Sequence, residues 1–235
     1  MTAFPSPNCG ERRGGVRPSL IVIHYTAMAS HQAARARLCD PTAEVSAHWL
    51  ISQQGAAEAL VPEPLRAWHA GAGAWAGLDD INSHSIGIEL DNSGQQPFAA
   101  PQMAALERLL AAIMDRWTIP AHRVIAHSDM APTRKVDPGP RFDWRRLARA
   151  GLSVWPCDAA KPGQPHDFVA AACRFGYPPV DAQVLLAAFR LRFRPWAHGP
   201  GDAVDAGLAA DLARRFAVGR FADDRFIVDG PTAQA

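Results

Sequence analysis

The sequence has few cysteines, and no two of them form a C-x-x-C pair. Cys9, Cys39, Cys157 and Cys173 are the four cysteines in a chain of 235 residues. This number and spacing argue against a thiolate zinc finger and against a disulfide-dense scaffold. We therefore expect reduced thiols with structural roles.

An excess of one charge and a long apolar run are also missing. Lys and Arg number 24 against 23 Asp and Glu, so no strong field is available to hold nucleic acid or an anionic membrane. No run approaches the about 18 apolar residues of a membrane span. The start, MTAFPSPNCGERRGG, does not resemble a secretory signal. As written, the sequence predicts a cytoplasmic protein; a periplasmic or outer-membrane-associated location is the alternative if an export signal is missing.

Short apolar segments predict the strands. Three of them are each followed by an ionisable residue: 20–23 by His24, 86–88 by Glu89 and 124–126 by His127. Segments of this length indicate buried strands. Two further segments, 49–51 and 59–61, flank Gln53-Gln54-Gly55 and predict a hairpin.

Helical periodicity lies between these strands. Apolar residues recur at three- and four-residue steps over 101–117, and a shorter helix is expected over 29–38 with Ser30 as its N-cap. Strands that alternate with helices predict a layered α/β domain.

The composition changes near residue 156. Three prolines and a glycine fall between 156 and 165, as is typical of a linker. We expect a main domain over 1–156, a linker over 157–165 and a small three-helix domain over 166–230. Its helices are predicted at 167–175, 181–193 and 202–216.

Three alternate arginines, Arg190, Arg192 and Arg194, lie at the end of the second of these helices. They could favour an anionic glycan or peptide carboxylates, but alternate arginines on a helix are usually solvated.

The two strand-end histidines, His24 and His127, need polar partners because an unpaired polar group in a buried position is costly. Coordination of a metal supplies one, and catalytic zinc sites use three protein ligands and an open position. Asp137, ten residues after His127, is a third candidate. A lone strand-end histidine is more often a hydrogen-bonded core residue, and Asp before Pro-Gly is usually a turn former. Their joint occurrence with Glu89 favours a metal centre, and no HExxH, Walker loop or G-x-S-x-G elbow is present as a competing motif.

Six ordered motifs make the pattern specific. They are IVIHYT (21–26), SAHWLI (46–51), AWHAG (67–71), SIGIEL (85–90), AHSD (126–129) and RKVDPGP (134–140). Together they resemble the zinc-dependent N-acetylmuramoyl-L-alanine amidases, the type-2 amidase family related to phage T7 lysozyme and the peptidoglycan recognition proteins. The resemblance covers about residues 6–156.

The resemblance implies a fold and a set of site residues. The family fold is a mixed sheet flanked by helices, with zinc in a groove. By motif position, the zinc ligands are His24, His127 and Asp137, a catalytic glutamate is Glu89, and a catalytic lysine is Lys135.

Four further motif positions are candidates for substrate binding: His48, Trp68, His69 and Asn82. For His48 and Trp68 a core role is the open alternative, and Asn82 could instead order the loop before strand 86–88.

The implied reaction is hydrolysis of the amide between N-acetylmuramic acid, or its 1,6-anhydro form, and L-alanine in peptidoglycan fragments, during cell-wall turnover or recycling. The C-terminal segment resembles, less specifically, a three-helix peptidoglycan-binding module, with a structural helical cap as the alternative. Two other functions remain open: a peptidoglycan recognition protein without activity, and a zinc peptidase acting on the stem peptide.

Overall fold

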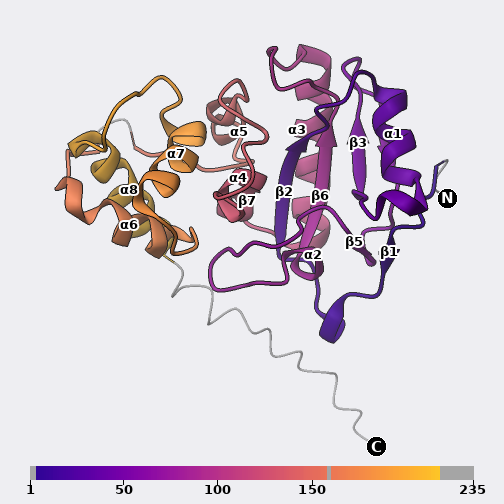
Figure 1. Cartoon of the computed structure of the whole chain (residues 1–235), viewed down its shortest axis with the longest axis horizontal. Coiled ribbons are helices and arrows are strands. Elements are labelled where there is room, and N and C mark those ends of the chain that lie inside the picture. The colour runs from indigo at the N-terminus through magenta and orange to yellow at the C-terminus, as the bar shows by residue number, and fades with distance from the viewer. Residues whose placement is uncertain (1–3, 158–159, 218–235) are drawn as a thin grey trace, which may run out of the picture.

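The computed structural model describes residues 4–157 and 160–217 (Figure 1). Residues 158 and 159 of the expected linker and residues 218–230 of the expected helical domain lie outside the described residues. All four cysteines are within them, as free thiols. Within the described part of the chain, no helix has the length and apolar character needed to cross a bilayer.

A five-stranded mixed sheet forms the centre of the molecule. Its strands, in spatial order, are β4 (Ala57–Ala59), β3 (Trp49–Ile51), β6 (Ser85–Leu90), β2 (Leu20–Tyr25) and β7 (Val124–Ala126). The last four are parallel, and β4 pairs with β3 antiparallel. The second strand of the hairpin, expected at 59–61, is β4 and lies two residues earlier in the chain. A separate antiparallel pair joins β1 (Cys9–Gly10) to β5 (Arg66–Ala67).

Helices flank the sheet, which confirms the expected α/β class. They are α1 (His31–Cys39), α2 (Ile81–His84), α3 (Ala100–Trp117), α4 (His127–Met130), α5 (Trp144–Arg149), α6 (Phe168–Phe175), α7 (Ala182–Phe193) and α8 (Ala203–Phe216). Short 3₁₀ turns are η1 (Arg13–Gly15), η2 (Pro41–Ala43), η3 (Ala121–Arg123) and η4 (Pro165–Asp167). Ser30 caps α1 as expected, because its hydroxyl accepts a hydrogen bond from the Ala33 N–H at 3.2 Å.

The strand alternation divides the sheet residues between two faces. One face packs on α3 through Ile21, Ile23, Ile86, Ile88 and Leu90. Val22 belongs to a different buried cluster, and His24 follows it by two residues. Since β2 and β6 are paired with His24 opposite Glu89, both ionisable side chains lie on the face away from α3.

The C-terminal helices share a hydrophobic core with the sheet. One buried cluster joins Val22 of β2 and Ile125 of β7 to Phe175, Phe189 and Phe193 of α6 and α7. In Figure 1 these helices gather at the end of the molecule next to α4 and α5, whereas α1 lies at the opposite end. The domain boundary at 157–165 stays a prediction.

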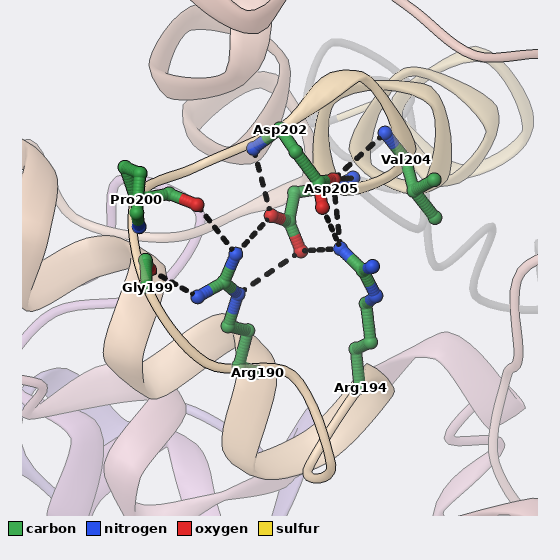
Figure 2. A network of polar contacts seen from close by, with 7 residues as sticks. All are labelled: Arg190, Arg194, Gly199, Pro200, Asp202, Val204 and Asp205. Atoms are coloured by element: carbon green, nitrogen blue, oxygen red, sulfur yellow. Dashed lines mark hydrogen bonds and ion pairs between the residues drawn. The ribbon is translucent and has the colours of Figure 1, made fainter.

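The expectation that the three alternate arginines are solvated is wrong: Arg190 and Arg192 of α7 are buried, and Arg194, directly after the helix, is largely covered. Residues two apart on a helix point to different sides, and α8 covers one of these sides of α7 while α4 covers the other. Arg190 and Arg194 both bind the buried Asp205 of α8 (Figure 2), at 2.5 Å and 3.0 Å. The side chain of Arg192 is fully buried and faces Asp129 of α4.

Candidate metal centre and its groove

Three side chains from three different segments converge on one point. His24 lies near the end of β2, His127 begins α4 directly after β7, and Asp137 follows in the next loop. Nδ1 of His24 is 2.8 Å from Nδ1 of His127, and Oδ2 of Asp137 lies 3.1 Å and 2.9 Å from these two nitrogens. All three residues are buried, and each offers one ligand atom to the same small volume. The group could therefore hold a metal ion.

The electrostatics keep these groups in the forms that bind metals. Burial, together with repulsion from His127, lowers the pKa of His24 to about 4, so its imidazole is neutral at pH 7. Burial alone would raise the pKa of Asp137, but its hydrogen bonds to His127 and His24 lower that pKa to well below the usual range. Asp137 is therefore a carboxylate.

The hydrogen bond of Nε2 of His127 determines which of its two ring nitrogens can bind a metal. Nε2 of His127 lies 3.0 Å from the carbonyl oxygen of Ala70. A carbonyl can only accept, so Nε2 carries the proton and Nδ1 carries the lone pair. This is the arrangement in which a backbone carbonyl orients a metal-binding histidine.

A longer chain of hydrogen bonds determines which ring nitrogen of His24 carries the proton. The hydroxyl of Ser85 donates to the carbonyl oxygen of Ile81 at 2.5 Å, so it accepts from Nε2 of His69 at 3.1 Å. Nδ1 of His69 then accepts from Nε2 of His24 at 3.0 Å. Nδ1 of His24 is left with its lone pair.

With the protons on the two Nε2 atoms, two imidazole lone pairs and one carboxylate oxygen face one another, and this arrangement is repulsive unless a cation occupies the centre. In the metal-free protein a proton on Nδ1 of a histidine takes this place, and it supplies the hydrogen bonding that lowers the pKa of Asp137. The donor set, two imidazoles and one carboxylate, matches the three-ligand catalytic sites that zinc adopts.

Gly87 makes room for this arrangement. A Cβ at Gly87 would lie 2.4 Å from the His69 ring, so a side chain there would displace His69. Burial lowers the pKa of His69 well below its usual value, which keeps the ring neutral and able to accept a hydrogen bond at Nδ1.

A groove of about 250 Å³ opens beside the three candidate ligands, and His127 forms part of its lining. Glu89, Lys135, His69 and Trp68 are among the residues that line it. Burial, then the charge of Asp137, raises the pKa of Glu89 to about 8. Oε2 of Glu89 is buried and has no hydrogen-bond partner among the described residues. One buried oxygen of this carboxyl group therefore has no structural partner, and the group lines the same groove as His127.

Two predicted substrate-binding residues lie behind the groove rather than on its wall. Nδ1 of the buried His48 accepts from the Gly87 N–H at 2.9 Å. The Asn82 side-chain oxygen accepts from the N–H groups of His69 and Ala70 at 3.0 Å and 2.8 Å. His48 and Asn82 use these polar atoms to order the backbone around the groove.

Sequence reasoning missed several residues that support the site. Ser85 stands at the end of the hydrogen-bond chain from His24, and Arg134 donates to the carbonyl oxygens of Ala70 and Ala72. Asp129 accepts from the Ala126 N–H just before His127, at 2.8 Å. Asp129 and Arg134 lie inside quoted motifs, but only the three-dimensional contacts reveal what they support.

Residues 14–140 match the family model described as N-acetylmuramoyl-L-alanine amidase. The N-acetylmuramoyl-L-alanine amidase AmiD of Escherichia coli is 36% identical, with 85% of this chain and 84% of the relative aligned. The 1,6-anhydro-N-acetylmuramyl-L-alanine amidase AmpD of Haemophilus influenzae is 35% identical over 60% of this chain and 86% of its own length.

Solved structures agree with this match. The complex of E. coli AmiD with the substrate anhydro-N-acetylmuramic acid-L-Ala-D-gamma-Glu-L-Lys superimposes with a TM-score of 0.79 at 33% identity. It covers 87% of this chain and 92% of that structure. AmpDh3 of Pseudomonas aeruginosa, in complex with anhydromuramic pentapeptide, has a TM-score of 0.78 at 31% identity and covers 87% of this chain and 94% of that structure.

Proposed function

This chain belongs to the N-acetylmuramoyl-L-alanine amidase family, and we propose that it is a zinc hydrolase of peptidoglycan fragments. The bond cleaved is the amide between N-acetylmuramic acid, or its 1,6-anhydro form, and L-alanine. The observation that carries the proposal is the convergence of His24, His127 and Asp137 beside Glu89, one of whose carboxyl oxygens is buried without a hydrogen-bond partner. The substrate bound in E. coli AmiD contains this bond.

His24, His127 and Asp137 would hold the zinc ion. When bound, zinc supplies positive charge that acidifies water to a pKa of about 7 and polarises a carbonyl group. The remaining steps fall to the side chains of the groove.

We assign the proton transfers to Glu89. Its carboxyl group shares the groove with the ligands, and its raised pKa reflects burial. A nearby dication favours the ionised form, so Glu89 in the loaded enzyme accepts a proton from the attacking water. It then returns that proton to the nitrogen of the departing L-alanine, which leaves as an amine.

We assign stabilisation of the developing oxyanion to Lys135. It lines the same groove, and its ammonium group can donate to an oxygen that gains negative charge in the transition state. Trp68 and His69 also line the groove, so we propose that the substrate packs on this wall. His48 and Asn82 support it from behind.

The test compares two substrates. The zinc-loaded protein is incubated with anhydro-N-acetylmuramic acid-L-Ala-D-γ-Glu-L-Lys and, separately, with the sugar-free peptide, and the products are identified by mass spectrometry. Release of the intact peptide from the first substrate alone is expected. Binding without cleavage would favour a recognition protein, and cleavage within the free peptide would favour a peptidase.

A comparison of soluble anhydromuropeptides with insoluble sacculi as substrates then distinguishes a role in recycling from a role in turnover of the intact wall. Preference for soluble fragments indicates recycling. Efficient release from sacculi indicates turnover of the intact wall.

For the helices after the predicted linker 157–165 we propose peptidoglycan binding, centred on Trp196. The side chain of Trp196 is 68% exposed. Its loop is braced by Arg190, which donates to the carbonyl oxygens of Gly199 and Pro200 at 2.7 Å and 3.0 Å (Figure 2). An exposed aromatic plane on a braced loop is a suitable surface for a sugar ring.

Binding to purified sacculi tests this role. Trp196→Ala should weaken sedimentation with sacculi several-fold, whereas Val204→Ala, at another exposed apolar residue, should not. Equal binding of the two variants would contradict a glycan contact at Trp196.

A further inference from the structure

A buried network connects the C-terminal helices to the turn that presents His127. Asp129 lies two residues after His127 in α4, and Arg192 comes from the end of α7. Nη1 of Arg192 lies 2.5 Å from Oδ2 of Asp129, and both side chains are fully buried. The hydroxyl of Tyr177 donates to Oδ1 of the same carboxylate at 2.5 Å.

The same guanidinium also holds the strand in front of His127. Nη2 of Arg192 donates to the carbonyl oxygen of Val124 at 3.0 Å and to Oγ of Ser153 at 3.1 Å. Oδ2 of Asp129 accepts from the Ala126 N–H at 2.8 Å. Arg192 and Asp129 therefore bracket His127, with contacts three residues before it and two residues after it.

The bracketed turn is also hydrogen-bonded to Asp137, a second proposed metal ligand. The Ser128 N–H donates to the carbonyl oxygen of Asp137 at 3.0 Å. A shift of α4 would therefore move His127 and pull on the loop that carries Asp137.

We propose that Arg192 and Tyr177 are positioning residues for the metal centre, acting through Asp129. The C-terminal helices would then complete the support of the His127 turn, in addition to any part they take in binding peptidoglycan. The inference rests on the proposed metal site, since it concerns the placement of His127 and Asp137 toward the ion. Partners that orient metal ligands typically change metal affinity by about 10- to 100-fold when they are removed.

Helix α7 provides a matched control. Arg190 also forms a buried ion pair, with Asp205 at 2.5 Å, but that pair lies within the helical domain (Figure 2) and touches neither β7 nor α4 in the contacts of the described residues. Arg190→Met and Arg192→Met therefore each remove a buried guanidinium group from the same helix, although Asp205 keeps Arg194 as a partner. Only the second removes support from the His127 turn.

The experiment measures zinc affinity of the full chain by competition with a chromogenic chelator, alongside thermal unfolding of the metal-free protein. Arg192→Met should weaken zinc binding at least tenfold, whereas Arg190→Met should lower the unfolding temperature but change zinc affinity less than twofold. Because Arg192→Met leaves a buried carboxylate without its cation and can unfold the chain, Tyr177→Phe serves as a second variant. It removes one hydroxyl and should weaken zinc binding several-fold.

Zinc affinity equal to wild type in Tyr177→Phe and in folded Arg192→Met would overturn the inference while leaving the proposed hydrolase intact. Equal weakening by Arg190→Met and Arg192→Met would also overturn it, because the effect would then follow general stability. A wild-type chain that binds no zinc would overturn both proposals.

Discussion

Nδ1 of His69 lies 3.0 Å from Nε2 of His24, on the edge of the His24 ring that faces away from Asp137. Because His69 in turn donates to Ser85, this contact determines which nitrogen of His24 has a lone pair. A motif histidine that was expected to touch substrate thus orients His24, a proposed metal ligand.

Replacing His69 should weaken metal binding. His69→Ala removes the acceptor that keeps the proton on Nε2 of His24, so we expect zinc affinity to fall about 10- to 100-fold. Chelator competition measures it. Ser85→Ala should have a smaller effect in the same direction, and unchanged affinity in both variants would show that the hydrogen-bond chain does not control the ligand.

The ligands and the proposed base should respond differently to substitution. His127→Ala should lose zinc in proportion to protein, as measured by metal analysis after gel filtration. Glu89→Gln should retain one zinc per chain but lose about 10²- to 10⁴-fold in turnover, the usual contribution of a general acid–base group. A fully active Glu89→Gln variant would remove Glu89 from the mechanism.

Lys135→Ala should lower kcat far more than it raises KM. Removal of one oxyanion donor typically costs about 3 kcal/mol in the transition state, a loss that steady-state kinetics on the anhydromuramoyl tripeptide can resolve. If KM rises while kcat is unchanged, Lys135 binds the ground state and the assignment is incorrect.

The metal-free protein should become less stable as the pH rises from 6.5 to 8. Burial, with the charge of Asp137, raises the pKa of Glu89 to about 8, whereas an unfolded glutamate titrates at about 4.3. In this window the folded state holds a proton that the unfolded state has released, so the free energy of unfolding falls with pH. His24, whose pKa is lowered to about 4, acts in the opposite direction only below about 6.5.

Urea unfolding of chelator-treated protein at several pH values measures this dependence. The slope should approach about 1.4 kcal/mol per pH unit at most, and Glu89→Gln should flatten it. Equal slopes in the two proteins would place the titrating group elsewhere.

The sequence was sufficient to predict the elements with strong patterns. Apolar runs located β2, β6 and β7 with their terminal ionisable residues, because each strand is buried on both faces. The prediction placed β4 two residues too late, because Leu60 and Val61 are buried without belonging to a strand. An apolar pair alone does not distinguish the two situations.

The support around the site was beyond sequence reasoning for a different reason. His24, His127 and Asp137 could be chosen from strand ends and spacing, since chemistry restricts metal ligands to a few residue types. Arg192 and Asp129 are 63 residues apart, and nothing in the local pattern of α7 separates an arginine bound to solvent from one bound to a buried aspartate. Only the packing of α7 against α4 reveals the pair.

Crystals of the zinc-loaded protein test the central claim most directly, by anomalous diffraction at the zinc absorption edge. The account predicts a single strong peak within about 2.0–2.2 Å of Nδ1 of His24, Nδ1 of His127 and a carboxylate oxygen of Asp137. A structure without a peak between these three residues, or with zinc bound by other side chains, would contradict it.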